Sequence, residues 1–278
     1  MIDIHSNTDA DSAFDPGDLG GFADPTLPGR SLEAQFEAIW QRFNGLARTV
    51  DTLISPSARW RRLLTPVNVS LIVPIQDEAA TAYLMEAQRQ LNLYMAYDPQ
   101  PVEKLHITLV LFGFLRAALP LPGTLTMSEL RQLAGSLEKV FARLPSFTVR
   151  VGPINAFPNV AIAEVHDDGQ LRWLEKAAVE LIPKSRRNAA PYPLIPHITL
   201  GYFGSRPTRP IIRVLTQLRE MPALDLRIDQ TALTLYYRGF GPYRAKYALR
   251  HSVEEVVDII PLKSNVNNSS SAKDETKS

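Results

Sequence analysis

The sequence contains no cysteine among its 278 residues and only five histidines. Without cysteine the chain cannot form a disulfide scaffold, a thiolate zinc site, an iron–sulfur cluster or a cysteine nucleophile. No apolar run approaches the roughly 20 residues that a membrane-spanning helix needs. Residues 1–10 also lack the basic start and apolar core of a secretory signal. We therefore expect a cytoplasmic protein, with the nucleus as the alternative location, and no membrane partner.

Charge is distributed unevenly, although the formal net charge is only +1. Residues 1–29 contain six aspartates and neither lysine nor arginine, so they carry −6 and the remaining residues carry +7. Glycine and proline without apolar periodicity predict a flexible acidic arm over residues 1–30. The asparagine- and serine-rich end predicts a disordered tail over residues 263–278. The basic body between them is compatible with a phosphate-bearing ligand.

Between residues 31 and 54, apolar residues recur at alternating spacings of four and three, which is typical of a helix with one apolar stripe. These residues are Leu32, Phe36, Ile39, Phe43, Leu46, Val50 and Leu53. Such a stripe either docks on its own domain or forms a coiled-coil dimer. Gly45 costs a long helix about 1 kcal/mol relative to alanine. We therefore favour docking, with self-association through residues 31–54 as the alternative, and expect a basic connector from there to residue 66.

From residue 67 to residue 262, strand-like and helix-like segments alternate, which predicts an α+β or α/β domain. Strands are expected over residues 69–75, 105–113, 147–151, 160–165, 195–203, 231–237 and 243–249, the last two as a closing hairpin. Helices are expected over residues 77–97, 126–143, 169–182 and 208–222. Thr126 and Glu129 have the spacing of a capping box, and Asp168 is the expected cap of the helix that follows it.

Two eight-residue segments of this body repeat 91 residues apart. Residues 106–113 read HITLVLFG and residues 197–204 read HITLGYFG, so six of eight positions agree. Alternate side chains of a strand share a face, so each histidine projects beside the threonine that follows two residues later. If an approximate two-fold axis relates the two halves, the two histidine–threonine pairs face each other across a cleft.

This arrangement suits acid–base chemistry on a phosphate. One neutral histidine can take a proton while a second, protonated histidine gives one. Threonine hydroxyls can donate hydrogen bonds to the non-bridging oxygens and hold the phosphorus between the imidazoles. We therefore expect His106 and His197 to be catalytic, and Thr108 and Thr199 to bind the phosphate.

The duplicated His-x-Thr resembles the 2H phosphoesterase superfamily, which includes 2′-5′ RNA ligase-like proteins and RNA 2′,3′-cyclic phosphodiesterases. The resemblance spans roughly residues 67–249 and includes the Phe157-Pro158 turn and Pro196 before the second histidine. It implies a bilobal α+β domain over residues 67–262, in which two pseudo-symmetric antiparallel sheets with outer helices flank a central groove. It also implies catalysis without a metal or other cofactor. The chain departs from the family pattern at Asn159 and at Gly201–Tyr202, where many relatives carry basic residues.

The resemblance implies a phosphodiesterase that opens ribose 2′,3′-cyclic phosphates, at RNA ends or in cyclic nucleotides, to 2′-phosphates. Two alternatives stay open: a 2′,5′-oligonucleotide phosphodiesterase, and a non-catalytic member that binds nucleotides or RNA. Four aromatic residues are candidates for stacking on a base: Phe112, Phe203, Tyr202 and Tyr236. Strand alternation sets the two phenylalanines on the histidine face, but for them we favour packing in the core over stacking on a base.

Overall fold

The computed structural model describes residues 31–50, 67–94, 98–115, 123–183, 195–237 and 253–263. The acidic arm expected over residues 1–30, the connector over residues 51–66 and the strand expected over residues 243–249 lie outside these ranges. So does the expected tail, apart from its first residue.

The described residues form five helices and ten strands, together with a short 3-10 turn at Val102–Lys104. The helices are α1 (Leu32–Asn44), α3 (Glu78–Tyr94), α4 (Met127–Phe141), α5 (Gln170–Glu180) and α6 (Thr208–Leu218). The strands are β1 (Val67–Pro74), β2 (Asp98–Pro99), β3 (His106–Leu115), β4 (Thr124–Leu125), β5 (Phe147–Phe157), β6 (Val160–His166), β7 (His197–Tyr202), β8 (Leu224–Ile228), β9 (Gln230–Tyr237) and β10 (Val253–Pro261). None of these helices is long and apolar enough to cross a membrane.

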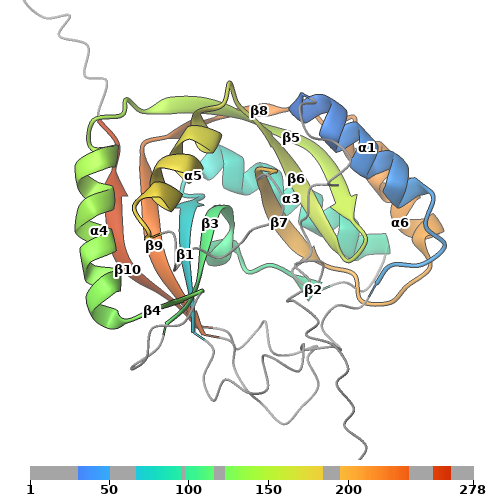
Figure 1. Ribbon diagram of the computed structural model, residues 1–278. Coiled ribbons are helices and arrows are strands. Elements are labelled where there is room, and N and C mark those ends of the chain that lie inside the picture. Colours follow the sequence, from blue (N-terminus) through green and yellow to red (C-terminus); the bar gives the residue numbers. More distant parts are fainter. Residues whose placement is uncertain are drawn as a thin grey trace, which may run out of the picture.

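The strands form one curled sheet in the order β10-β9-β1-β3-β7-β6-β5-β8, with β2 added to β7 and β4 to β3 (Figure 1). All neighbours are antiparallel except β3 and β4. The expected mixture of helices with antiparallel strands is therefore confirmed. The expectation of two separate sheets is corrected, because a single residue pair between β3 and β7 joins the two halves into one sheet.

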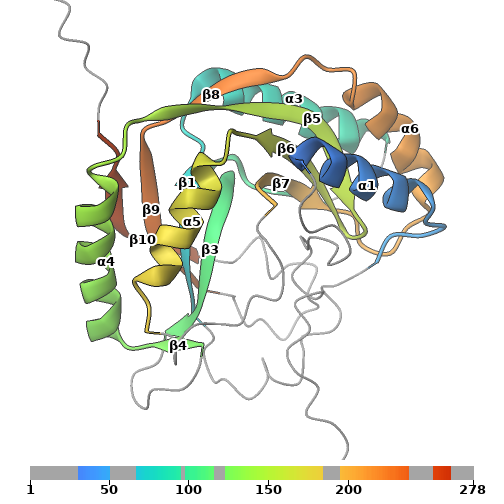
Figure 2. The same ribbon diagram turned by 45° about the horizontal axis from the view of Figure 1, so that its top comes forward.

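Helices cover both halves of the sheet (Figures 1 and 2). In the first half α4 packs against β10 and α5 against β3. In the second half α3 packs against β7 and β8, α6 against β5, and α1 lies over β5 and β6. The main apolar core fills the space between the sheet and these helices. Both faces of β6 are buried, since every residue of this strand is buried.

The cap expected from the sequence is present at the start of α4 but not at the start of α5. At α4 the expected capping box is confirmed: Thr126 Oγ1 accepts a hydrogen bond from the amide of Glu129 at 3.2 Å, and the Glu129 carboxylate accepts one from the Thr126 amide at 2.8 Å. At α5 the N-cap residue is Gly169, and the carboxylate that binds the start of the helix is Asp167 rather than Asp168. The Asp167 carboxylate accepts from the amides of Gly169 at 3.1 Å and Leu171 at 2.7 Å.

The first helix is shorter than the apolar stripe predicts. It ends at Asn44, one residue before Gly45, and not near residue 54. Its buried residues Phe36, Ile39, Trp40 and Phe43 pack against the same chain, which favours docking over a coiled coil. Residues 46–50 leave the helix and bind a neighbouring loop. The helix therefore stops where glycine weakens it and where other backbone partners become available.

Candidate active site

The two His-x-Thr motifs begin neighbouring strands at the junction between the two halves of the sheet. His106 is the first residue of β3, and His197 is the first residue of β7. The two strands pair through Ile107 and Ile198, the central residues of the motifs. The fold therefore brings together two motifs that lie 91 residues apart in the sequence.

The motif side chains divide between two environments. Ile107 and Ile198 are fully buried in the main core. The polar residues of both motifs, here called the motif quartet, are half-buried and alternate with them: His106, Thr108, His197 and Thr199. Because side chains alternate along a strand, the quartet projects from the face opposite the two isoleucines. An antiparallel register centred on the isoleucine pair sets each histidine beside the threonine of the other motif.

Both imidazole rings are held in the same way. Nδ1 of His106 lies 2.9 Å from the carbonyl oxygen of Lys104, and Nδ1 of His197 lies 2.9 Å from that of Ile195. A carbonyl oxygen only accepts, so Nδ1 is the protonated nitrogen in each neutral ring. Nε2 is then the atom that gains or loses a proton. In both motifs the acceptor is the carbonyl two residues before the histidine.

The two histidines interact electrostatically. Burial lowers the pKa of His197 from its ordinary value of 6.5, and positive charge on His106 lowers it further. The hydrogen bond to the Ile195 carbonyl opposes this shift without cancelling it. His197 is therefore neutral near pH 7, with an Nε2 lone pair that can accept a proton.

An aromatic ring also contacts His197. The ring centroid of Phe157, the last residue of β5, lies 5.2 Å from that of His197, and the two rings are nearly perpendicular at 77°. Phe157 is buried in a second, smaller apolar cluster. It was not among the site residues expected from the sequence. The Phe157-Pro158 turn was visible there, but nothing local indicates which strand such a turn will face.

The two phenylalanines belong to the core, which is the interpretation favoured from the sequence over base stacking. Phe112 is 2% exposed and Phe203 is 1% exposed. The register of β3 against β1 skips Leu109 and then Phe112 itself, and the register of β7 against β6 skips Leu200. An irregularity of this kind adds one residue and reverses the alternation beyond it. Strand alternation from the histidines therefore does not extend to either ring, because Phe112 is itself skipped in the register of β3 and Phe203 lies beyond the end of β7.

The two tyrosines lie at different distances along the sheet from the quartet. Tyr202 ends β7, is half-buried and packs against the smaller apolar cluster. Tyr236 is also half-buried but lies on β9, which β1 separates from β3. The fold thus sets Tyr202 on the strand of the second motif and Tyr236 two strands from the first motif. Contact of either ring with a base stays a prediction.

The residues at which the chain departs from the family pattern take part in main-chain contacts beside the second motif. Asn159 is 4% exposed, and its carbonyl accepts a hydrogen bond from the Phe203 amide at 3.0 Å. Gly201 pairs with Ala161 of β6.

Within the described residues no three histidine, aspartate or glutamate side chains are grouped so that they could hold a metal ion. Catalysis without a metal stays a prediction.

Comparison with known proteins identifies a matching family model and similar folds. The model of a protein family described as the 2′-5′ RNA ligase superfamily matches residues 76–240, more than half of the chain. The crystal structure of TT0787 of Thermus thermophilus is similar, with a TM-score of 0.51 and 21% identity over 71% of this chain and 99% of that one. The apo structure of E. coli LigT gives a TM-score of 0.49 and 14% identity, over 72% and 99% of the two chains. At these identities the likeness concerns the fold. No curated protein sequence matches the chain.

Proposed function

Because the chain belongs to the 2′-5′ RNA ligase superfamily of 2H phosphoesterases, we propose that it hydrolyses ribose 2′,3′-cyclic phosphates to 2′-phosphates. The substrates would be RNA ends or cyclic nucleotides. One observation carries the proposal: two His-x-Thr motifs pair side by side through Ile107 and Ile198, with both Nδ1 atoms bound to the main chain. With Nδ1 occupied in both rings, one Nε2 atom can take a proton from water while the other gives a proton to the departing ribose oxygen.

We assign the two histidines different roles on the basis of their electrostatics. His197 has a lowered pKa and takes a proton from water as the general base. Charge on His106 is one cause of that lowering, and we assign to His106 the complementary role of general acid. The water oxygen forms a bond to phosphorus, the bond from phosphorus to the ribose O3′ breaks, and His106 protonates O3′. The product keeps its phosphate on O2′, and exchange with solvent restores both rings.

The threonines and the symmetry complete the proposed mechanism. Thr108 and Thr199 donate hydrogen bonds to the non-bridging oxygens and stabilise the charge that develops on them. In both repeats the register skips the residue directly after the threonine, Leu109 or Leu200, and this supports an approximate two-fold relation between the halves. Such symmetry would set the phosphorus between the two Nε2 atoms.

Product identification tests the function. We would incubate the purified protein, with a chelator present, with a 2′,3′-cyclic mononucleotide and with a 2′,5′-linked dinucleotide, and identify the phosphate isomer formed. The proposal expects the 2′-phosphate, and a loss of about 10²- to 10⁴-fold in kcat for His106→Ala and for His197→Ala.

Other outcomes contradict the proposal in specific ways. Cleavage of the 2′,5′ linkage alone would identify a 2′,5′-oligonucleotide phosphodiesterase. Binding of the cyclic nucleotide without turnover would identify a non-catalytic member of the family. Turnover only after a metal is added, or full activity in the His106→Ala/His197→Ala double variant, would refute two-histidine catalysis.

A further inference from the structure

The described chain contains a segment that the family match does not cover. Residues 31–50 comprise α1 and the extended residues that follow it, and the match begins only at residue 76. We call these residues the N-terminal brace. The main contacts of α1 are with β5, β6 and α6, all in the half of the sheet that carries His197 (Figures 1 and 2).

The brace covers the sheet face that carries the second motif. In the antiparallel register of β6 and β7, Ile162 lies opposite Thr199, and Glu164 lies opposite His197. Directly opposed residues of an antiparallel pair project from the same face. Ile162 packs in the smaller apolar cluster with Phe36 and therefore beneath α1. The helix thus lies on the face from which His197 projects, one strand away from it.

The smaller apolar cluster links the brace to both supports of the His197 ring. It contains Phe157, which meets the ring edge-on, and Ile195, whose carbonyl accepts the Nδ1 proton. The brace contributes Phe36, which is 1% exposed, and Ile39 to the same cluster. Displacing α1 would therefore loosen the ring contact and the hydrogen-bond acceptor together.

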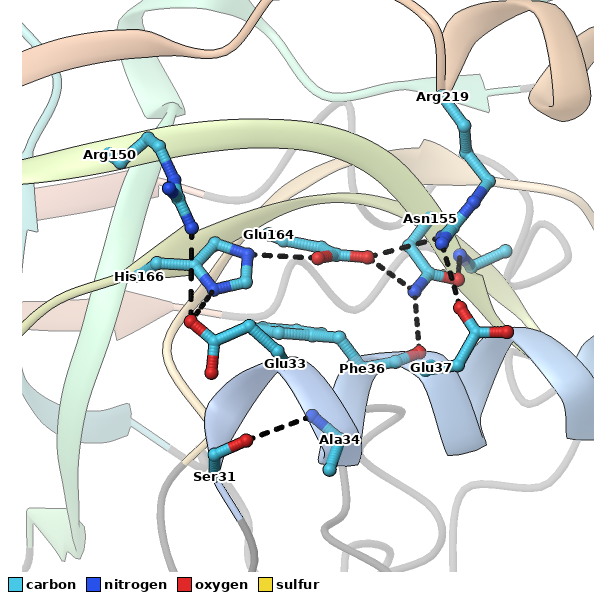
Figure 3. Close-up of polar contacts among 11 residues, drawn as sticks. Ser31, Glu33, Ala34, Phe36, Glu37, Arg150, Asn155, Glu164, His166 and Arg219 are labelled. Atoms are coloured by element: carbon cyan, nitrogen blue, oxygen red, sulfur yellow. Dashed lines mark hydrogen bonds and ion pairs between the residues drawn. The ribbon is translucent and has the colours of Figure 1, made fainter.

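Buried polar contacts fix the turn of α1 that carries Phe36 (Figure 3). The fully buried Asn155 donates through Nδ2 to the Phe36 carbonyl at 3.0 Å and to Glu164 at 2.7 Å. Arg219 reaches Glu164 at 3.3 Å and Glu37 of α1 at 3.1 Å (Figure 3). Since buried hydrogen bonds are costly to break, these contacts fix the position of the helix along the strands.

The extended end of the brace binds two loops that flank the motif. The Thr49 amide donates a hydrogen bond to the Arg206 carbonyl at 2.8 Å. In return, the Arg206 amide donates one to Thr49 Oγ1, also at 2.8 Å. The Val50 amide donates to the carbonyl of Pro158 at 2.9 Å, directly after Phe157. The brace thus holds the loop that follows β7 and the turn that carries Phe157.

We propose that the N-terminal brace is a positioning element for His197, acting through Phe157 and Ile195. It is an addition to the region that the family match covers, and it acts on one of the two motifs. The effect of the brace on turnover rests on the proposed function. The effect of the brace on the His197 ring does not rest on it, so the positioning role and the proposed function can be tested separately.

The test combines a titration with kinetics. In the substrate-free protein, ring ¹⁵N shifts of His197, assigned with His197→Ala, would be followed against pH in wild type, Phe36→Leu and Phe157→Leu. We expect both variants to move the His197 midpoint upward, toward 6.5, because they reduce its burial. On the cyclic substrate we expect kcat to fall about 10-fold with KM changed less than about 3-fold, because ring misplacement affects the transition state more than binding.

Phe141→Leu is the matched control. Phe141 is fully buried in the main core on α4, so the variant makes the same chemical change away from His197. We expect it to lower stability and leave the His197 midpoint and kcat at their wild-type values. Midpoints and kcat in Phe36→Leu and Phe157→Leu that match this control would overturn the proposal.

A measurement on the unmodified protein keeps the proposal testable if a variant does not fold. Nuclear Overhauser contacts are expected between the rings of Phe157 and His197, and between those of Phe157 and Phe36. Their absence would also overturn the proposal. Wild-type protein that shows these contacts and the variant-dependent midpoint, but does not turn over the cyclic phosphate, would refute the proposed function and leave the positioning role standing.

Discussion

Glu164 on β6 lies directly opposite His197 on β7, yet the carboxylate binds away from the imidazole. Glu164 is 3% exposed and contacts Arg219 at 3.3 Å and His166 at 2.9 Å (Figure 3). Its negative charge is thus compensated within the contacts that hold α1. The structure thereby places a buried carboxylate with a compensated charge and a neutral histidine on adjacent strands.

Removing the cation of that pair should destabilise the fold. We expect Arg219→Ala to lower the free energy of unfolding by about 3 kcal/mol, because it leaves the buried Glu164 carboxylate with less compensation. It also removes the guanidinium that lies 4.8 Å from the centre of the Trp40 ring. Denaturant unfolding measures the change. Arg89→Ala is the control, since the Arg89–Glu86 pair is exposed on α3 and should contribute nothing resolvable. Equal midpoints for the two variants would contradict the expectation.

Stability should depend on pH through His197. Its pKa is lowered in the folded state, so below 6.5 the unfolded chain binds a proton that the folded chain does not. The wild type should therefore be fully stabilised with respect to this group above pH 6.5 and lose stability as the pH falls toward the lowered value. Unfolding curves of wild type and His197→Asn between about pH 7 and pH 5 would show a smaller loss in the variant. Parallel pH dependences would show that His197 makes no such contribution.

The threonines should matter through their hydroxyl groups. We expect Thr108→Val and Thr199→Val each to lower kcat/KM for the cyclic phosphate by about 10- to 100-fold, the value of one or two hydrogen bonds to a charged group. Thr199→Ser keeps the hydroxyl and should retain most activity. Steady-state kinetics on the folded variants separates the two cases. If Thr199→Val and Thr199→Ser have the same activity, the Thr199 hydroxyl does not bind the phosphate and the side chain only stabilises the strand.

Gly113, which ends the first repeat, should not tolerate a side chain. Its φ is +119°, and a Cβ there would lie 2.1 Å from the carbonyl oxygen of Gly123. We expect Gly113→Ala to cost at least about 2 kcal/mol, since strain and a backbone clash add together. Gly135→Ala on α4 is the control, because a Cβ there meets nothing within 4 Å. It should stabilise the protein by about 0.5–1 kcal/mol. Thermal unfolding of both variants measures this: the midpoint should fall for Gly113→Ala and rise for Gly135→Ala.

Several elements could be predicted because their signals are local. The capping box at Thr126 and Glu129 was readable from two residues three positions apart, and the structure confirms it. The carboxylate that binds the start of α5 was not, since Asp167 and Asp168 are adjacent and only the chain path selects between them. β10 was missed, and it occupies the edge beside β9 where the sequence suggested a hairpin with residues 243–249. Edge pairing depends on long-range register, which a local pattern does not contain.

The sequence by itself determined the chemistry of the candidate site. Residue identity and the two-residue period of a strand suffice to set each histidine beside its threonine and opposite an apolar face. Only the tertiary structure decided that the motifs meet at Ile107 and Ile198, because pairing between segments 91 residues apart depends on the whole sheet. It also decided that Phe112 and Phe203 enter the core, since each strand departs from regular pairing beyond its threonine. Finally, it decided that α1 docks over β5 and β6, on the face from which His197 projects. The apolar stripe predicts which side of the helix is buried, but it does not predict the surface on which the helix packs.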